Sequence, residues 1–424
     1  MIYRKKRALL KHNHLIGCFI FLMSYFLTSQ SSYSGEQAVV NKLQTQINIL
    51  GQHHTSEDTW LAGELGRYDL SSNNSLIEIH QSYSSQFSPN LSLHSHLQVH
   101  QATESLSSNS LGLVEFKIKY TNDIDWRQTI SFTLGQFFLP ISMENSQIFW
   151  ESPYTLHFSS LNSWIGEEFR PIGLDSQYRY FLDNNQNIAI AATVFVGNDS
   201  MGALLAYRGW SIGRQRTLLG DVLALPDLEI LANENSFAGQ RDDGTRPFGK
   251  DLDKRPGYAL RAQFSSDQLL LSLAWINNNG DRELHSGEYA WDTRFAVFGA
   301  SWLINDNWEM LAEASQGSST MGDGPGVDID FYSAYIMASF FHDDKRLSIR
   351  AEQFGSEDND TLDQEQHDLG RALTLGLFWP INKKTFQLGF EMMYLNSKRN
   401  RTTVMGIHED SESLSLSVLG SLRF

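Results

Sequence analysis

Hydrophobic and polar residues alternate along much of this chain in short segments. Examples are "LIEIHQSYSS" (76–85), "LSLHSHLQVH" (91–100), "LVEFKIKY" (113–120) and "QLLLSLAWIN" (268–277). Because successive side chains of a strand point to opposite faces, each segment predicts a β-strand with one apolar face. Each is also close to the roughly 9 to 11 residues that a tilted strand needs to cross a membrane. The last segment, "SESLSLSVLGSLRF" (411–424), keeps this alternation up to Phe424.

The connections between these segments alternate in length. Short links such as "TNDIDW", "LDNNQN", "HDDK" and "INKK" take turns with long polar ones, which cover roughly 103–110, 137–170, 198–256, 278–290, 318–328, 356–370 and 398–412. Short turns at one end and long loops at the other are typical of outer-membrane barrels. Counted back from the C-terminus, the pattern predicts about sixteen strands, with the first near 59–69. An even number of strands allows the barrel to close with both ends on one side. We therefore expect an all-β fold, a transmembrane antiparallel β-barrel over 59–424.

The beginning of the chain has the layout of a secretory signal peptide. A basic region (residues 4–11) precedes an apolar run from Leu15 to Leu27, and small residues follow before Gly35. A membrane anchor is the alternative, but the run is shorter than the roughly 20 residues that a spanning helix needs. Removing residues 1–34 would change the formal net charge from −16 to −16 − 5 = −21 and would remove the single cysteine, Cys18. Such an acidic product is a poor candidate for binding nucleic acid.

Residues 35–58 are predicted to form a periplasmic leader ahead of the barrel. Val40, Leu43, Ile47 and Leu50 are spaced by three and four residues, which favours a short helix. A flexible leader fits the same residues.

Two short stretches carry a resemblance to a known family. "GQFFLPISME" (135–144) resembles the Gly-Gln-Phe-x-x-Pro stretch, followed closely by a glutamate, of the phosphate- and pyrophosphate-selective porins. The terminal Phe424 looks like the assembly signal of bacterial outer-membrane barrels. The resemblance implies a sixteen-stranded channel, a homotrimer, and a location in the outer membrane of a Gram-negative bacterium. It also implies contact with outer-membrane lipid, lipopolysaccharide and the barrel-assembly machinery.

In such porins the third external loop folds inward and narrows the channel, and residues 137–170 correspond to that loop here. Loops of this length are uncommon without a function. The alternative is a surface loop capped by its own aromatic residues. The candidate constriction residues are Glu144, Trp150, Glu151, Tyr154, Trp164, Glu167, Glu168 and Arg170.

Alternation also assigns charged side chains to the inside of the barrel, with both signs represented equally. The acidic ones are Glu78, Glu115, Asp175, Glu309, Glu313, Glu352 and Glu391, and the basic ones are Lys117, Lys119, Arg127, Arg179, Arg261, Arg350 and Arg423. The acidity of the whole chain therefore does not predict a cation-selective pore. Lys117, Lys119, Arg127 and Arg179 form a basic cluster in the lumen, which could attract anions or be neutralised by the loop glutamates.

Histidines gather on the same inner faces. A simple register places His80 opposite His94, and Glu78 opposite His96, while His100 shares their face. Imidazole and carboxylate groups could bind zinc, but a polar lumen wall is the commoner role, and no metal or cofactor is predicted.

The function predicted from these patterns is passive diffusion of small hydrophilic solutes or ions through a porin. No G-x-S-x-G motif of a hydrolase occurs, so an enzyme is not expected. The alternative is a non-conducting outer-membrane barrel that acts as an adhesin or assembly scaffold through its long external loops.

Overall fold

The computed structural model describes residues 40–55, 73–100, 109–223, 225, 245–248, 251–322, 326–360, 367–382, 385–399 and 410–424. The predicted signal peptide (1–34) and the predicted first strand near 59–69 lie outside these residues. No helix among the described residues is long and apolar enough to cross a membrane.

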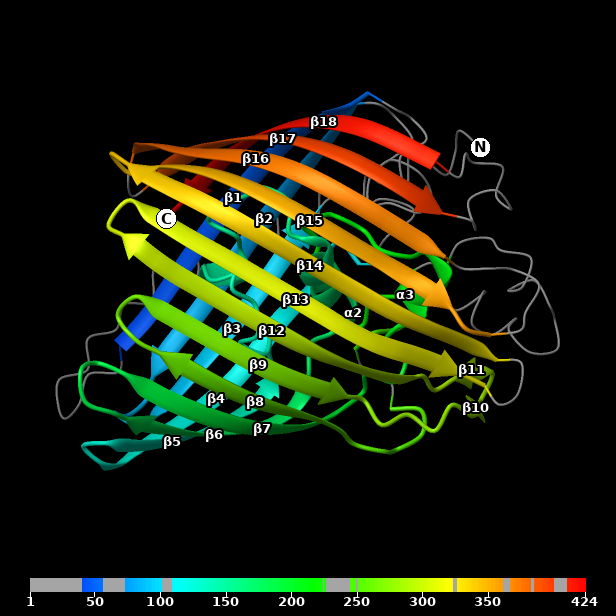
Figure 1. Ribbon diagram of the computed structural model, residues 1–424. Helices are drawn as coiled ribbons and strands as arrows, with labels where there is room; N and C mark the ends of the chain where they lie inside the picture. The colour runs from blue at the N-terminus through cyan, green and yellow to red at the C-terminus, as the bar shows by residue number, and fades with distance from the viewer. Residues whose placement is uncertain are drawn as a thin grey trace, which may run out of the picture. The chain divides into compact units, whose positions relative to one another are not determined.

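Sixteen strands form one closed antiparallel barrel, as predicted (Figure 1). Each strand pairs with the barrel strand before it and the one after it, and β1 closes the ring against β18. The strands are β1 (Val40–His54), β2 (Asn73–Gln86), β3 (Leu91–His100), β4 (Leu111–Asp125), β5 (Gln128–Gln136), β6 (Ile172–Phe181), β7 (Asn187–Val196), β8 (Gly257–Ser265), β9 (Leu269–Asn277), β12 (Asp292–Asn305), β13 (Trp308–Met321), β14 (Val327–His342), β15 (Lys345–Asp358), β16 (Asp368–Asn382), β17 (Phe386–Arg399) and β18 (Asp410–Arg423).

The connections alternate in length as the sequence indicates. The link between β14 and β15 is the two-residue turn Asp343–Asp344, whose φ angles of 47° and 66° match the left-handed turn that twisted hairpins prefer. The connection from β9 to β12 is long and carries a small hairpin of β10 (Leu284–His285) and β11 (Glu288–Tyr289) at the opposite end of the barrel (Figure 1).

The predicted faces of the strands are confirmed. Leu416 and Val418 are each 48% exposed on the outside of β18, whereas Ser417 between them is buried on the inside. Aromatic side chains lie exposed on the outer surface close to several strand ends, as an interfacial girdle requires: Tyr120, Trp126, Trp275, Trp302, Trp308, Trp379 and Tyr394. The outer face is therefore suited to lipid.

The predicted leader is wrong where the structure describes it, because Val40–His54 is strand β1 and not a helix. Its outer face carries Ile49, and its inner face carries Asn48 and Leu50. Pairing from Gln46 with Arg423 to His54 with Ser415 covers the edge of β18. In lipid that edge would otherwise expose unpaired backbone groups, so closure overrides the weak helical spacing.

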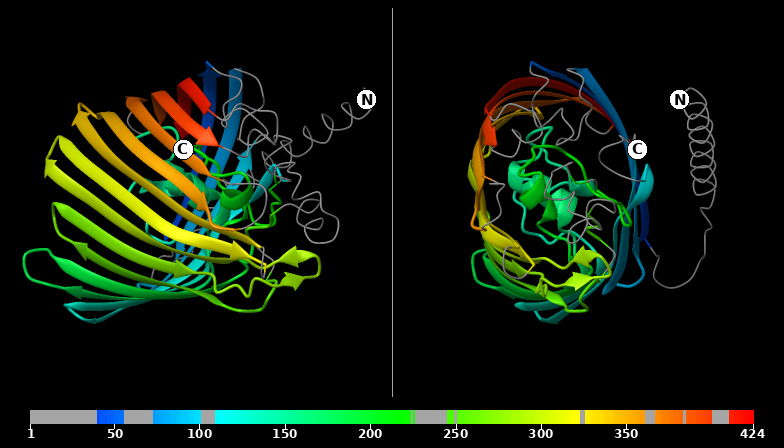
Figure 2. Two further views of the ribbon diagram at one scale, coloured as in Figure 1. Left: turned by 45° about the vertical axis from the view of Figure 1, so that its right-hand side comes forward. Right: turned by 90° about the vertical axis from the view of Figure 1, so that its right-hand side faces the viewer.

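Two connections enter the ring of strands. The link from β5 to β6 (137–171, the third connection) contains the single turn η1 (Ile148–Trp150) and α2 (Ser160–Glu168). The link from β7 to β8 (197–256, the fourth connection) contains α3 (Ala203–Tyr207). In the view along the barrel these helices lie within the ring (Figure 2). We use the term loop body for 137–171 together with 197–223.

The assignment of β1 to the membrane can be tested with a charge. Ile49 lies mid-strand on the outer face and is 56% exposed, so Ile49→Lys should lower the free energy of unfolding by about 2–4 kcal/mol. Urea unfolding in lipid vesicles would measure this change. Gln44→Lys, on the inner face of the same strand, is the control and should cost much less. Equal losses would contradict the position of β1.

Candidate functional site

Inward-facing carboxylates of the wall hold the third connection in place. Glu391 of β17 accepts a hydrogen bond from the backbone N–H of Leu156 at 2.6 Å, and it also pairs with the ring of His157. Glu352 of β15 accepts the backbone N–H of Ser160 at 2.8 Å, where α2 begins. These contacts join residues about 190 or more positions apart, so the third connection is fixed by the far wall.

Arg350 of β15 is the main cationic anchor of the third connection. Its guanidinium group is fully buried and forms ion pairs with Glu144 and Glu352. It also donates to the backbone carbonyl of His157 at 3.0 Å. A buried cation is tolerable only with such partners, and removing one partner of a buried pair typically costs about 3–5 kcal/mol.

Glycines on the inner wall allow the third connection to approach closely. A Cβ atom added at Gly376 of β16 would lie 2.5 Å from the backbone oxygen of Tyr154. One added at Gly389 of β17 would lie 2.6 Å from the side chain of Leu156. Both glycines therefore act as notches: Gly376 receives the loop backbone, and Gly389 receives a loop side chain.

The described part of the fourth connection contacts the third at several points. Arg208 forms a bidentate ion pair with Glu167 at 2.8 and 2.7 Å. The backbone N–H of Phe158 donates to the carbonyl of Gly213 at 2.7 Å. Arg170 donates to the carbonyls of Val114 and Thr217, and its guanidinium lies over the rings of Phe138 and Phe248. The two connections therefore form one folded unit.

Glu168, at the end of α2, binds the beginning of α3. Its carboxylate accepts hydrogen bonds from the backbone N–H groups of Gly202 at 3.1 Å and Leu204 at 3.0 Å, and from the indole of Trp164 at 2.7 Å. Burial raises the pKa of Glu168 to about 7, although these donors act in the opposite direction.

An apolar core fills the space between the loop body and much of the wall. Trp164 of α2 packs edge-on against Phe295 of β12 at 4.9 Å and Phe331 of β14 at 5.2 Å between ring centroids. Trp210 also packs against this group, and its indole donates to the carbonyl of Gly355. As far as the structure describes it, the inside of the barrel therefore contains a buried apolar core as well as polar groups.

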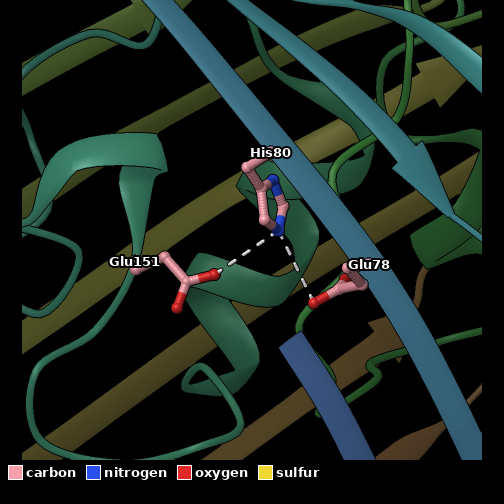
Figure 3. A group of neighbouring side chains, drawn as sticks. All are labelled: Glu78, His80 and Glu151. Carbon is pink, nitrogen blue, oxygen red and sulfur yellow. Dashed lines mark ion pairs between the residues drawn. The ribbon is translucent and has the colours of Figure 1, made fainter. Parts of the chain in front are cut away.

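A charged cluster lies between the loop body and the opposite wall, formed by β1, β2 and β3. Arg214 donates to Glu78 and to Glu151, each at 3.0 Å, and Arg216 donates to Glu151 at 2.8 Å. The Nε2 atom of His80 lies 3.7 Å from a carboxylate oxygen of each glutamate (Figure 3).

This geometry does not favour a metal ion. The two carboxylates and the imidazole lie close enough to act as ligands. However, the same carboxylate oxygens already accept hydrogen bonds from Arg214 and Arg216, and the two arginines balance both negative charges. A divalent cation would leave an uncompensated buried charge.

The simple register expected for the histidines is wrong. His80 lies opposite Gln98 and Glu78 lies opposite His100, because the short turn 87–90 shifts the pairing of β2 and β3. The shift brings the ring of His80 to that of His96, with Nδ1 and Nε2 3.1 Å apart. The ring of Phe149, from the third connection, contacts both imidazoles.

All eight predicted constriction residues are buried, and each contacts other protein groups. Trp150 stacks on Phe138 at 4.0 Å between centroids, and the hydroxyl of Tyr154 donates to Glu309 at 3.0 Å. The contacts of Glu144, Glu151, Trp164, Glu167, Glu168 and Arg170 are those given above. The more exposed positions of the third connection are uncharged: Pro140, Ser142, Ser146, Gln147, Ile148 and Pro153.

The predicted basic cluster is divided in the structure. Lys117 pairs with Glu115 at 3.0 Å. Arg127 lies in the two-residue turn between β4 and β5, not on the lumen face of a strand, and pairs with Asp183, also at 3.0 Å. Lys119 and Arg179 remain partly or fully exposed on inner faces of β4 and β6, and within the described residues neither forms an ion pair.

Sequence reasoning missed the fourth connection as an internal element. Arg208, Arg214 and Arg216 lie in a long connection that carries no strand pattern, so alternation does not mark them as facing the inside. The available signal was the group of apolar residues in the same stretch, all of which are buried: Met201, Leu204, Leu205, Tyr207, Trp210 and Ile212.

No protein-family model and no curated protein matches this sequence. Solved structures do share its fold. The outer membrane channel DcaP of Acinetobacter baumannii has 10% identity and a TM-score of 0.55, with 93% of this chain and 100% of that chain covered. The anion-selective porin of Comamonas acidovorans has 10% identity and a TM-score of 0.52, with 91% and 100% covered. OmpF of Salmonella typhi, in complex with daunomycin, has 11% identity and a TM-score of 0.50, with 91% and 97% covered.

At these identities the likeness establishes the fold, which is that of the outer-membrane porins. A closed sixteen-stranded barrel with an apolar outer face and charged side chains inside is a structure that spans an outer membrane. The resemblance to phosphate- and pyrophosphate-selective porins stays a prediction.

The role of the glycine notch can be tested by filling it. Gly376→Val should push the backbone of Tyr154 away from β16 and destabilise the barrel by about 1–3 kcal/mol, as overpacking does. The temperature at which the folded barrel band disappears in electrophoresis should therefore fall. Gly420→Val is the matched control, because an added Cβ there meets its nearest atom only at 3.8 Å. Similar losses in both variants would argue against the notch.

The raised pKa of Glu168 predicts a pH dependence of stability. The folded protein retains a proton that the unfolded carboxyl, with a pKa of about 4.3, has lost. This contribution to stability is complete below the unfolded pKa and is lost as the pH rises through about 7. Glu168→Gln should flatten the decrease in thermal midpoint between pH 5 and pH 8. Identical pH profiles for wild type and variant would exclude this residue as the cause.

Proposed function

We propose that this protein is an outer-membrane porin of a Gram-negative bacterium, a passive diffusion channel for small hydrophilic solutes or ions. The observation that carries the proposal is the closed sixteen-stranded barrel whose inner face stays polar and partly exposed toward the short turns. We call this part of the inner face the vestibule. It is lined by Lys117, Lys119, Gln177, Arg179, Arg261 and Gln263.

The third connection is the natural constriction element in this proposal. Its partners on β13, β15 and β17 hold it across the interior, and its uncharged exposed residues face the remaining space. The buried candidates, among them Glu144, Glu167 and Glu168, would then act by positioning the loop. Their charges are balanced or bonded within the protein.

The charge of the vestibule supports a preference for anions. Glu115 and Asp175 are each paired with a basic residue, Lys117 and Arg261 respectively. Lys119 and Arg179 therefore supply positive charge that no described carboxylate offsets through an ion pair. The anion-selective porin of Comamonas acidovorans has the same fold, which is compatible with this preference.

Conductance in planar lipid bilayers tests the proposal. The purified barrel should form ion-conducting pores, and Lys119→Gln with Arg179→Gln should shift the reversal potential in a tenfold salt gradient toward cations. Because the Debye length is about 10 Å at 0.1 M and about 3 Å at 1 M, the shift should be larger in dilute salt.

Arg127→Gln is the matched control, because Arg127 is already paired with Asp183 beside a turn. The control should keep the wild-type reversal potential. A folded barrel that carries no current would refute the channel and favour the adhesin or scaffold alternative. A pore whose selectivity the double variant leaves unchanged would refute only the anion preference.

The other partners remain part of the same proposal. They are outer-membrane lipid, lipopolysaccharide, two further copies in a homotrimer, and assembly machinery that recognises Phe424. The backbone of Phe424 also exchanges two hydrogen bonds with Thr45, at 2.9 and 3.2 Å. Loss of this residue would therefore weaken barrel closure as well as any recognition. No catalytic role, metal or cofactor is proposed.

A further inference from the structure

The loop body meets two very different walls. Toward β12, β14 and β15 it packs through the apolar core around Trp164 and Trp210 and through the ion pairs of Arg350. Toward β1, β2 and β3 it meets a wall whose buried side chains are mostly polar or charged, apart from Leu50 and the partly buried Leu76, which pack in a small apolar cluster with Leu156. We call the polar part of this surface the polar wall. Its residues are Asn48, Glu78, His80, Ser82, His96, Gln98 and His100, all of them buried.

The apolar side resists opening. Exposing an apolar side chain to water is unfavourable in proportion to its surface area, and Trp164 is fully buried among other aromatic rings. Separating Arg350 from Glu144 and Glu352 would also expose a buried ion-pair network. A hydrated route on this side would therefore require the core to come apart.

At the polar wall, contact with water is favourable rather than unfavourable. Several of its buried atoms have no hydrogen-bond partner among the described residues: Oγ of Ser82, Nδ1 of His96, Oε1 of Gln98 and both ring nitrogens of His100. A buried polar atom without a partner is unfavourable, because it has lost its hydrogen bonds to water. Water entering between this wall and the loop body would satisfy these atoms, so the contact gains hydration when it opens.

Two features keep the polar wall covered. Arg214 and Arg216 of the fourth connection bind Glu151 of the third, and Arg214 also binds Glu78 of the wall. Beside them Phe149 lies on the rings of His80 and His96. Phe149 and Trp150 both have left-handed backbone angles, with φ of 65° and 55°. Such angles are unfavourable in a residue with a side chain, so the covering segment is strained.

We propose that the hydrated route through the loop-filled part of the barrel runs along the polar wall, and that Arg214 and Arg216 form a latch across it. The inference rests on the proposed channel function and adds the fourth connection as the element that sets the width and charge of the passage. With the latch closed, the carboxylates of Glu78 and Glu151 are neutralised. With the arginines removed, the same carboxylates would face the route as negative charges.

Thiol accessibility tests the route without relying on current. Cysteine is placed at Gln98 of the polar wall or at Ile329 of the apolar core, both almost fully buried. Modification by a small cationic thiol reagent is followed by mass spectrometry on folded barrels in vesicles. Gln98→Cys should react at least tenfold faster than Ile329→Cys, and Arg214→Gln with Arg216→Gln should raise its rate at least another tenfold.

Arg208→Gln is the matched control, because Arg208 also binds a glutamate between the two connections, but its partner is Glu167 of α2. It should leave the rate at Gln98→Cys unchanged. Equal rates at the two cysteine positions, or equal acceleration by the Arg208 and latch variants, would overturn the proposal. Retention of the heat-modifiable band identifies the folded barrels to be compared.

Current recorded from the same proteins separates the two proposals. The latch variant should conduct more than wild type and shift its reversal potential toward cations. The channel function would be refuted if Gln98→Cys is labelled as expected but neither the wild type nor the latch variant carries any current. A conducting barrel without the labelling difference would refute the route alone.

Discussion

The structure depends on one constraint, which is that no backbone N–H or C=O group can remain unpaired in lipid. This constraint makes β1 a strand. Without Val40–His54, the outer edge of β18 and that of β2 would both be open, and the polar inside would have no enclosure. Closure in turn creates an interior shielded from lipid, in which inward carboxylates and arginines can serve as attachment points for the loop body.

The interior is organised by pairing rather than by net charge. The chain carries a formal charge of −16, yet the inward glutamates that hold the third connection are bonded to backbone N–H groups, to Arg350 or to His157. The arginines of the fourth connection neutralise Glu78, Glu151 and Glu167 in the same way. Among the inward-facing residues that the structure describes, Lys119 and Arg179 are fully or partly exposed and form no ion pair.

Much of the fold could be predicted from the sequence because alternation is a property of each strand by itself. It places Leu416 outside and Ser417 inside, and the seven inward acidic side chains are all buried. Alternation does not indicate what covers an inward face. The contact of Glu391 with Leu156 joins residues 235 positions apart, and 197–223 has no alternation that would assign it to the inside of the barrel. The spacing of Val40, Leu43, Ile47 and Leu50 was misleading because spacings of three and four place these residues on both faces of β1, so alternation does not show in them.

The glycine notches at Gly376 and Gly389 also bear on how the molecule can fold. The segment around Tyr154 and Leu156 is synthesised more than two hundred residues before the strands on which it rests. Contacts of such sequence separation form late, because chain entropy must be lost before they stabilise anything. Until β16 and β17 are in place, the aromatic residues of the third connection lack their native binding surface. Folding intermediates of this chain should therefore expose an apolar segment, which the cell must protect from aggregation.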